Sequence, residues 1–307
     1  MALVFSTSWN AFRHNSAKAL LFEIEELGFL DLELSFNLTA AMVEEVKALK
    51  DAGGFKIRSV HNYSPIPEGF KRENALPDCY SISSVDDEER KLAVKYTKRS
   101  IDTAYSLGAK VLVLHCGRVE MQDETRKLIG LYNQDFFDTE VFSSLRQEFI
   151  RERALLAPPF FDSVIHSLDE LNHYAQKKAI LLGIENRFYF REIPSFEEMG
   201  VILKKFKDTN IFYWHDTGHA QLMENLGFNS HKDYLDSYKD SLIGIHLHNI
   251  IGCLDHQAPV KGEFDFSELK PYLKKDTLKV IEAHHPATVS EIKESKVLLE
   301  RLFDGIL

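Results

Sequence analysis

The chain has 307 residues, with 37 Lys and Arg against 47 Asp and Glu, a formal net charge of −10 and 44% hydrophobic residues. This composition excludes a disordered or collagen-like chain, and the acidic balance gives no reason to expect a nucleic-acid partner. No stretch approaches the roughly 20 apolar residues of a membrane span, and the first residues lack the basic start of a secretory signal. Three widely spaced cysteines without a CxxC motif fit a reducing compartment, so we expect a cytoplasmic protein.

Short β-rich runs alternate with long helical patterns along the chain. The runs that predict strands are residues 3–7, 29–35, 56–61, 110–116, 179–185, 211–216, 242–248 and 278–284. Apolar residues at three- and four-residue spacing predict helices between them, the clearest at 16–27, 39–53, 86–108, 161–178 and 290–303. Strand then helix, repeated eight times, is the pattern of an α/β protein of the (β/α)8 TIM barrel type. A doubly wound sheet would need a glycine-rich phosphate loop, and neither GxGxxG nor GxxxxGKS/T occurs.

Two spacings exceed what a strand-helix repeat needs. Residues 62–85 form a long polar loop after strand three, and residues 117–160 form a longer insertion after strand four, with a helical run near 140–156. Both follow the carboxyl ends of strands, the catalytic rim of such barrels, where long loops shape a pocket or lid. We find no second domain, and predict a single barrel over residues 1–307.

Polar residues with ligand chemistry end one predicted strand after another. Six consecutive strands do this, with His61, His115, Glu185, Asp216 followed by His219, His246 with His248, and Glu282 followed by His284 and His285. Because alternate strand residues share a face, these side chains would converge at the barrel mouth. Several carboxylates and imidazoles in one mouth would repel one another without cations, so a divalent metal is the simplest physical account.

A single histidine at a strand end is more often a hydrogen-bonded structural residue than a ligand, and a single glutamate often caps the next helix. We keep this structural interpretation for five histidines outside the converging set: His14, His166, His173, His215 and His231. For the converging set it would need six coincidences at the same end of the strands.

These residues lie in motifs that resemble a known family. The motifs are GIENR (183–187), HDTGHA (215–220), GIHLHN (244–249), HQAPVKGEFDF (256–266) and IEAHHP (281–286). The chain resembles, over essentially its whole length, the xylose isomerase-like TIM barrels. That superfamily comprises sugar phosphate isomerases and epimerases, ketose 3-epimerases and apurinic endonucleases of the endonuclease IV type. The motifs indicate the superfamily and do not specify the activity.

The resemblance to the epimerase branch implies one divalent ion held by Glu185, Asp216, His246 and Glu282. Of these, Glu185 and Glu282 would also remove and return a carbon-bound proton through a metal-stabilised enediolate. In the same branch, Arg187 and His219 match positions that hold substrate oxygens, and Arg187 would also suit a carboxylate or phosphate. Glu33, at the end of strand two, matches a frequent acidic pocket position, although a capping or ion-paired role explains it equally well.

The resemblance to the endonuclease branch implies three zinc ions on nine ligands. His61, His115 and Glu185 match the first ion, and Glu185 also bridges to the second, which has the residues of the epimerase site. His219 and His256 match two ligands of the third. The remaining ligand should be an aspartate two residues before His256, where Leu254 stands, with Asp255 one position along. His61, His115, His219 and His256 are therefore candidates for additional metal or substrate contacts.

The loop after strand seven departs from its relatives. Lys261 adds a cation near the mouth that could contact an anionic substrate group, although a solvated loop lysine is the commoner case. Asn249 stands where many relatives have an aspartate. Metal identity stays open, since mostly oxygen ligands with one histidine suit Mn, Mg or Co, and the set His61, His115 and Glu185 suits Zn.

We therefore predict a metal-dependent isomerase or epimerase of a sugar, sugar phosphate or sugar acid. One alternative is a zinc-dependent phosphoester hydrolase, and a second is a non-catalytic carbohydrate-binding barrel. Cleaving abasic DNA would require a basic gripping surface, and the insertion 117–160 carries comparable numbers of acidic and basic residues. The expected partner is a small carbohydrate, with no membrane contact, and homo-oligomerisation stays open.

Overall fold

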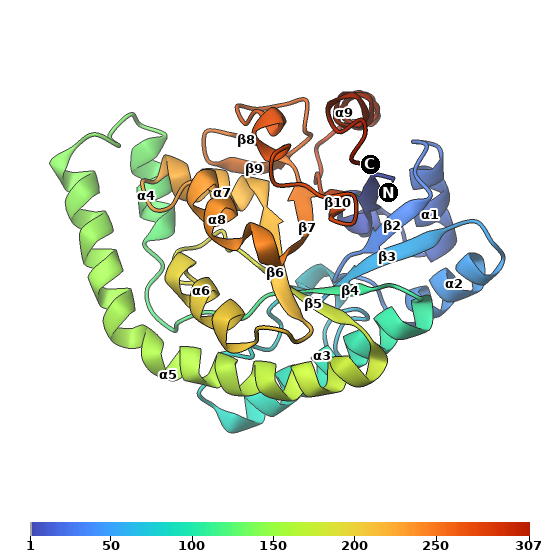
Figure 1. Cartoon of the computed structure of the whole chain (residues 1–307), viewed down its shortest axis with the longest axis horizontal. Helices are drawn as coiled ribbons and strands as arrows, with labels where there is room; N and C mark the ends of the chain where they lie inside the picture. The colour runs from blue at the N-terminus through green and yellow to red at the C-terminus, as the bar shows by residue number, and fades with distance from the viewer. Residues whose placement is uncertain (1) are drawn as a thin grey trace.

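The computed structural model describes residues 2–307 and confirms the barrel. Eight parallel strands close in the order β1-β10-β7-β6-β5-β4-β3-β2, and helices surround them (Figure 1). The strands are β1 Val4–Ser6, β2 Asp31–Leu34, β3 Lys56–His61, β4 Val111–Leu114, β5 Leu181–Glu185, β6 Ile211–Asp216, β7 Leu242–Leu247 and β10 Leu278–Ile281. Every sequence-predicted strand is present, shortened at some ends.

Nine α-helices are found in the part of the chain that the structure describes. They are α1 Ala17–Glu25, α2 Ala40–Asp51, α3 Asp87–Leu107, α4 Thr125–Tyr132, α5 Glu140–Lys178, α6 Phe196–Lys205, α7 Thr217–Asn225, α8 His231–Tyr238 and α9 Val289–Leu302. Most begin at a side chain that accepts a hydrogen bond from the first turn, as Ser195 and Thr288 do in full capping boxes. Between residues 2 and 307, none of the helices combines the length and apolar character that a membrane crossing requires.

The barrel interior is filled by a small apolar cluster around Trp214, with Val4, Val111, Val113, Leu278 and Val280. Trp214 lies on β6, and its indole packs against glycines on the two strands that flank it, Gly183 on β5 and Gly244 on β7. A Cβ on Gly244 would lie 1.9 Å from Cζ3 of Trp214, and one on Gly183 would lie 3.0 Å from its Cε3. Glycine at both positions therefore makes room for a large ring that forms the floor beneath the polar mouth.

The segment after β4 differs from the sequence prediction. We expected a helical run near 140–156 and a helix over 161–178, and consecutive prolines between two such segments normally end a helix. The structure has one continuous helix, α5, with Pro158 and Pro159 inside it. Both prolines are exposed, so the carbonyl groups left without an amide partner face water, which lowers the cost of continuing.

The amino-terminal half of α5 turns away from the barrel wall and, with α4, forms an arm beside α7 (Figure 1). A second apolar cluster holds this arm. In it Leu128, Phe142 and Phe149 pack against α7 and against Ile250 and Cys253, which follow β7. Arg153 anchors the middle of α5, because its guanidinium donates to both carboxylate oxygens of Glu198 at 3.0 and 2.7 Å. The insertion is thus an integral wall of the barrel rim.

A hairpin that the sequence analysis did not predict follows β7. Its antiparallel strands are β8 Asn249–Ile251 and β9 Leu254–Gln257. Asn249 fixes the loop beyond it, since its amide donates to the carbonyl groups of Pro259 and Phe264 and its carbonyl accepts from the amide of Phe264. This explains the asparagine at a position where relatives carry an acid.

Candidate metal centre and active site

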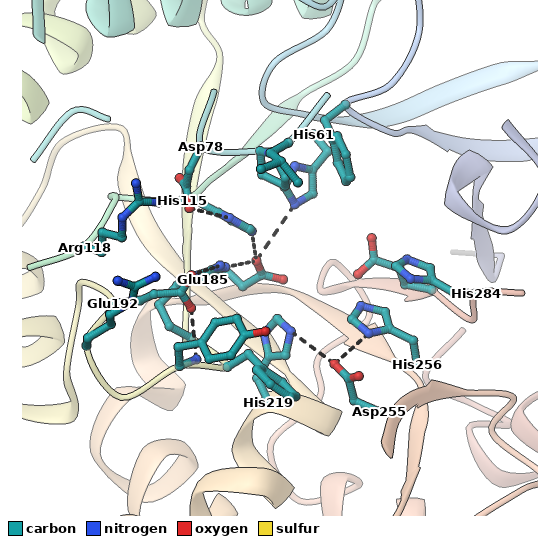
Figure 2. A pocket seen from close by; sticks show the side chains of 18 of the residues that line it. His61, Asp78, His115, Arg118, Glu185, Glu192, His219, Asp255, His256 and His284 are labelled. Atoms are coloured by element: carbon teal, nitrogen blue, oxygen red, sulfur yellow. Dashed lines mark hydrogen bonds and ion pairs between the residues drawn. The ribbon is translucent and has the colours of Figure 1, made fainter. Parts of the chain in front are cut away.

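A cavity of about 460 Å³ opens at the carboxyl ends of the barrel strands, a size typical of small-molecule sites. Most of the sequence-predicted polar residues line it. Figure 2 shows Glu185 at its centre, with His61 and His115 on one side and His219 and His256 on the other.

Glu185 is the last residue of β5 and contacts groups from several strands. Its Oε2 lies 2.7 Å from Nε2 of His115 and 2.9 Å from Nη1 of Arg187, and its Oε1 lies 2.6 Å from Nδ1 of His246. Burial alone would raise the pKa of this carboxyl, but His246 and His115 hold the pKa well below its usual range. Glu185 is therefore a charged carboxylate, and it belongs to two adjacent groups of candidate metal ligands.

His246 is fully buried and is oriented from below by Glu33. Its Nε2 lies 3.0 Å from Oε1 of Glu33, whose Oε2 accepts a hydrogen bond from the hydroxyl of Ser59 at 2.7 Å. Glu33 is itself completely buried and does not line the cavity. The structure thus favours the ion-paired role that the sequence analysis left open for Glu33, since this carboxylate fixes the ring of His246, as carboxylates behind metal-binding histidines do.

The other ring nitrogen of His246 faces three carboxylates. Its Nδ1 lies 2.6 Å from Glu185, 2.9 Å from Glu282 and 3.5 Å from Asp216. Burial alone would lower the pKa of His246, but Glu282, Glu33 and Glu185 raise this pKa well above its ordinary value.

This donor set fits a divalent cation. One imidazole nitrogen carries at most one proton, so it can satisfy only one of the three carboxylates that converge on it. Three carboxylates therefore bring more negative charge to this buried point than one imidazole proton neutralises, which is costly unless a cation lies between them. The candidate ligand atoms of Glu185, Asp216, His246 and Glu282 all lie within 4.8 Å of one another, which is the set expected from the sequence.

Asp216 also has a structural function at the start of α7. Its Oδ1 accepts a hydrogen bond from the backbone N–H of His219 at 2.8 Å, so the residue caps the helix. The side chain of Asn186 fixes its backbone by accepting from the Asp216 N–H at 2.7 Å. His248 adds a contact of 2.9 Å from Nε2 to both Asp216 oxygens. Contacts with His219, Asn186 and His248 therefore fix the orientation of Asp216.

A second group of possible ligands consists of His61, His115 and Glu185. Behind it, Oδ2 of Asp78 lies 3.6 Å from Nδ1 of His115. Burial alone would raise the pKa of Asp78, but His115 lowers this pKa. Asp78 is thus a longer electrostatic contact of His115, without the hydrogen bond that joins Glu33 to His246.

A third group lies beside α7 and the hairpin, and comprises Asp216, His219, His248 and His256. The sequence left open which residue supplies the aspartate expected near His256, because Leu254 stands at that position and Asp255 follows it. In the structure Leu254 is 64% exposed, whereas Oδ2 of Asp255 lies 2.7 Å from Nδ1 of His256 and 3.8 Å from Nε2 of His219. The hairpin therefore brings the carboxylate of Asp255 next to both His219 and His256.

His256 is held between two other imidazoles. Its ring stacks on His248 at 4.1 Å and on His284 at 3.8 Å between centroids, in a left-handed backbone conformation with φ of 53°. Burial alone would lower the pKa of His256, but Asp255 raises it to about 9. His256 therefore faces the cavity as a cation paired with Asp255.

Arg187 is the deepest cation of the cavity wall. It is only 6% exposed, and it contacts Glu185 at 2.9 Å and Glu192 at 3.4 Å. Burial alone would lower its pKa, but Glu192 and Glu185 raise this pKa above the ordinary value. It is therefore a permanently charged guanidinium that faces the cavity.

Lys261 is the predicted site residue that the structure places elsewhere. Its side chain is 55% exposed and its Nζ lies 3.1 Å from Glu291 of α9, outside the set that lines the cavity. The turn in which its N–H bonds to the carbonyl of Ala258 directs it outward. The structure places Lys261 in a surface ion pair, which agrees with the solvated role that the sequence analysis gave as the commoner case.

The sequence analysis did not select Asp78 or Glu192 as site residues, although both line the cavity. Each lies within a loop, where no strand end or periodicity distinguishes it from a solvated acid. The histidines kept as structural behave as expected where tested: His215 bonds to the hydroxyl of Tyr213 at 2.6 Å and to His231 at 3.0 Å, behind the barrel wall.

Comparison with known proteins agrees with this architecture. The sequence profile of the xylose isomerase-like TIM barrel family matches residues 21–300. An uncharacterised protein of Methanocaldococcus jannaschii is 26% identical over 209 residues, a match that spans 66% of this chain and 65% of that relative.

Solved structures with the same fold include a D-tagatose 3-epimerase-like protein, with a TM-score of 0.65 and 20% identity over 100% of this chain and 98% of that one. The 3-keto-D-glucoside 4-epimerase of E. coli has a TM-score of 0.66 and 16% identity over 98% of this chain and 100% of that one. The IolI protein with a bound zinc atom has a TM-score of 0.68 and 13% identity over 100% and 99% of the two chains.

Proposed function

This chain belongs to the xylose isomerase-like TIM barrel family, and on that premise we propose that it is a divalent-metal-dependent isomerase or epimerase of a carbohydrate. The observation that carries the proposal is the convergence of Glu185 and Glu282 on one nitrogen of His246, at 2.6 and 2.9 Å. Two carboxylates at one buried point suit a reaction in which a proton leaves a carbon and returns to it. Several structural neighbours are named as sugar epimerases, which agrees with this class.

Glu185, Asp216, His246 and Glu282 would hold the cation. When bound, a divalent cation acts as a Lewis acid that makes a carbon-bound proton next to a carbonyl more acidic. In the proposed reaction one of the pair Glu185 and Glu282 removes that proton, and the other delivers a proton to the resulting enediolate. Return to the opposite face of the same carbon gives an epimer, and return to the neighbouring carbon gives an isomer.

The remaining cavity residues would bind and orient the substrate. His219 donates from Nδ1 to the carbonyl of Asn186 at 3.1 Å, so its Nε2 faces the cavity as an acceptor for a hydroxyl. Arg187 offers guanidinium donors on the other side of Glu185. Glu33 acts through His246 and does not touch the substrate, whereas Asp78 lines the cavity beside His115.

The test uses exchange of the carbon-bound proton with solvent. Purified protein loaded with Mn²⁺ is incubated in D2O with a panel of ketoses and keto acids, and loss of the proton signal is followed by NMR. Glu282→Gln should reduce exchange by about 10²-fold or more, the usual contribution of a general acid or base, with only a partial loss of bound metal by elemental analysis. Glu268→Gln, an exposed carboxylate on the short helix before β10, is the matched control and should behave as wild type. Exchange at the wild-type rate in Glu282→Gln would exclude the proposed chemistry.

A second candidate is metal-dependent phosphoester hydrolysis, favoured by the two further ligand groups around His61 and His219. Measuring metal per chain separates the two candidates. One cation per chain supports the isomerase, whereas three zinc ions, with release of phosphate from simple phosphoesters, would support the hydrolase.

A further inference from the structure

Arginine side chains gather on one side of the cavity. Arg118 follows β4, Arg126 lies on α4, and Arg187 and Arg191 follow β5, and all of them line the cavity. β4 and β5 are neighbours in the barrel, so these arginines form one arc, whereas His256 and His284 come from the opposite side (Figure 2). We call the four arginines the arginine arc.

The acids of the cavity wall are already paired with other groups. Asp78 faces His115 at 3.6 Å, and Asp255 faces His256 at 2.7 Å. Glu192 contacts Arg187 and also accepts the N–H of Tyr189 at 3.0 Å, and the remaining carboxylates belong to the cation site. Of the arginine arc, Arg118, Arg126 and Arg191 therefore form no ion pair with a carboxylate that lines the cavity.

Their existing contacts leave hydrogen-bond donors free. Arg191 donates from Nη1 to the carbonyl of Met121 at 3.2 Å, and its buried Nε has no partner among residues 2–307. Arg126 is 75% exposed, donates to the hydroxyl of Tyr189 at 3.0 Å, and has its Nε 3.9 Å from Oδ2 of Asp123, which does not line the cavity. Arg118 uses only its Nε, on the rim residue Glu120 at 3.0 Å.

The deepest member of the arc has the same property. Arg187 is only 6% exposed, and its Nε lacks a hydrogen-bond partner within the described chain. Arg187 lines the cavity, so an anion bound there can accept charge-assisted hydrogen bonds from its guanidinium. Guanidinium groups match the oxygens of phosphate and carboxylate with paired hydrogen bonds.

We propose that the substrate is an anionic carbohydrate, a phosphate monoester or a carboxylate, whose charged end binds to the arginine arc while its carbonyl end lies at Glu185 and Glu282. This inference rests on the proposed function and narrows its substrate class. The protein as a whole repels anions, since its net charge is −10. The arginine arc gives one side of the cavity a local positive charge that attracts an anion.

The first experiment measures binding and does not depend on turnover. Inorganic phosphate is titrated calorimetrically into the metal-loaded protein and into Arg126→Gln, with Arg151→Gln as the matched control, since Arg151 lies exposed on α5 in the same insertion. Loss of one charge-assisted contact should weaken phosphate binding about tenfold in Arg126→Gln and leave Arg151→Gln unchanged. Equal binding by all three proteins, as for phosphate held by the cation alone, would overturn the proposal. Arg191→Gln repeats the test at a second position of the arc.

The second experiment distinguishes the anion. D-fructose, D-fructose 6-phosphate and D-fructuronate share a ketose end and differ in the other end, and each is tested for binding and for proton exchange in D2O. Tighter binding of the phosphate ester or of the uronate than of D-fructose, lost in Arg126→Gln, supports an anionic substrate and identifies which anion. If D-fructose binds as tightly as both charged compounds, the inference fails even where exchange occurs. If a charged compound binds through the arc and no compound exchanges its proton, the inference stands and the isomerase proposal fails.

Discussion

Replacing Gly244 with alanine should destabilise the barrel and weaken its cation site, because the new methyl group has no space. The Cβ would lie 1.9 Å from Cζ3, 2.3 Å from Cε3 and 2.5 Å from Cη2 of Trp214. The indole is fully buried and its centroid lies 5.0 Å from that of His246, so it cannot move away without displacing a proposed metal ligand. Overpacking of this kind costs about 1–3 kcal/mol, and a shift of His246 adds a loss of metal affinity.

Urea unfolding measures the stability, and titration with Mn²⁺ measures the affinity. Gly130→Ala is the matched control, because a Cβ there meets nothing within 4 Å and Gly130 lies inside α4, where alanine should stabilise by about 0.5–1 kcal/mol. Adding Trp214→Phe to Gly244→Ala removes the clashing atoms and should recover part of the metal affinity. A Gly244→Ala protein with wild-type unfolding and wild-type Mn²⁺ affinity would refute the packing that we describe.

Two further predictions concern stability. Arg153→Met should destabilise by about 1–3 kcal/mol, since the partly buried carboxylate of Glu198 loses its cation and keeps only the N–H of Ser195. Arg151→Met, on the exposed side of α5, should change the free energy of unfolding by less than about 0.5 kcal/mol. Similar urea midpoints for the two variants would contradict this anchor. Burial lowers the pKa of Lys279 from 10.5 to about 8, so between these pH values the unfolded chain binds more protons than the folded one, and stability should rise with pH. Urea midpoints at pH 8 and pH 10 should show this rise, and Lys279→Met should reduce it; an unchanged rise in the variant would exclude Lys279 as its source.

The strands could be predicted because each is a short apolar run with a polar residue at its end, and parallel strands bring those ends to one rim. The same reasoning places Glu185, Asp216, His246 and Glu282 at one rim, and the resemblance to the epimerases groups these four as one ligand set. This reasoning predicted two helical segments where α5 is one continuous helix, since prolines on an exposed face do not end the helix. It could not decide the direction of Lys261, because a loop direction depends on the turn that precedes it.

The sequence by itself determined the barrel, the converging ligands and the family, since these follow from periodicity, strand ends and motifs within short segments. Only the tertiary structure decided which groups lie behind the ligands: Glu33 beneath His246, Asp78 behind His115, and Asp255 beside His256. It also gathered the arginines of two loops into one arc. These contacts join residues far apart in the chain through loops and a hairpin, whose paths no local pattern specifies.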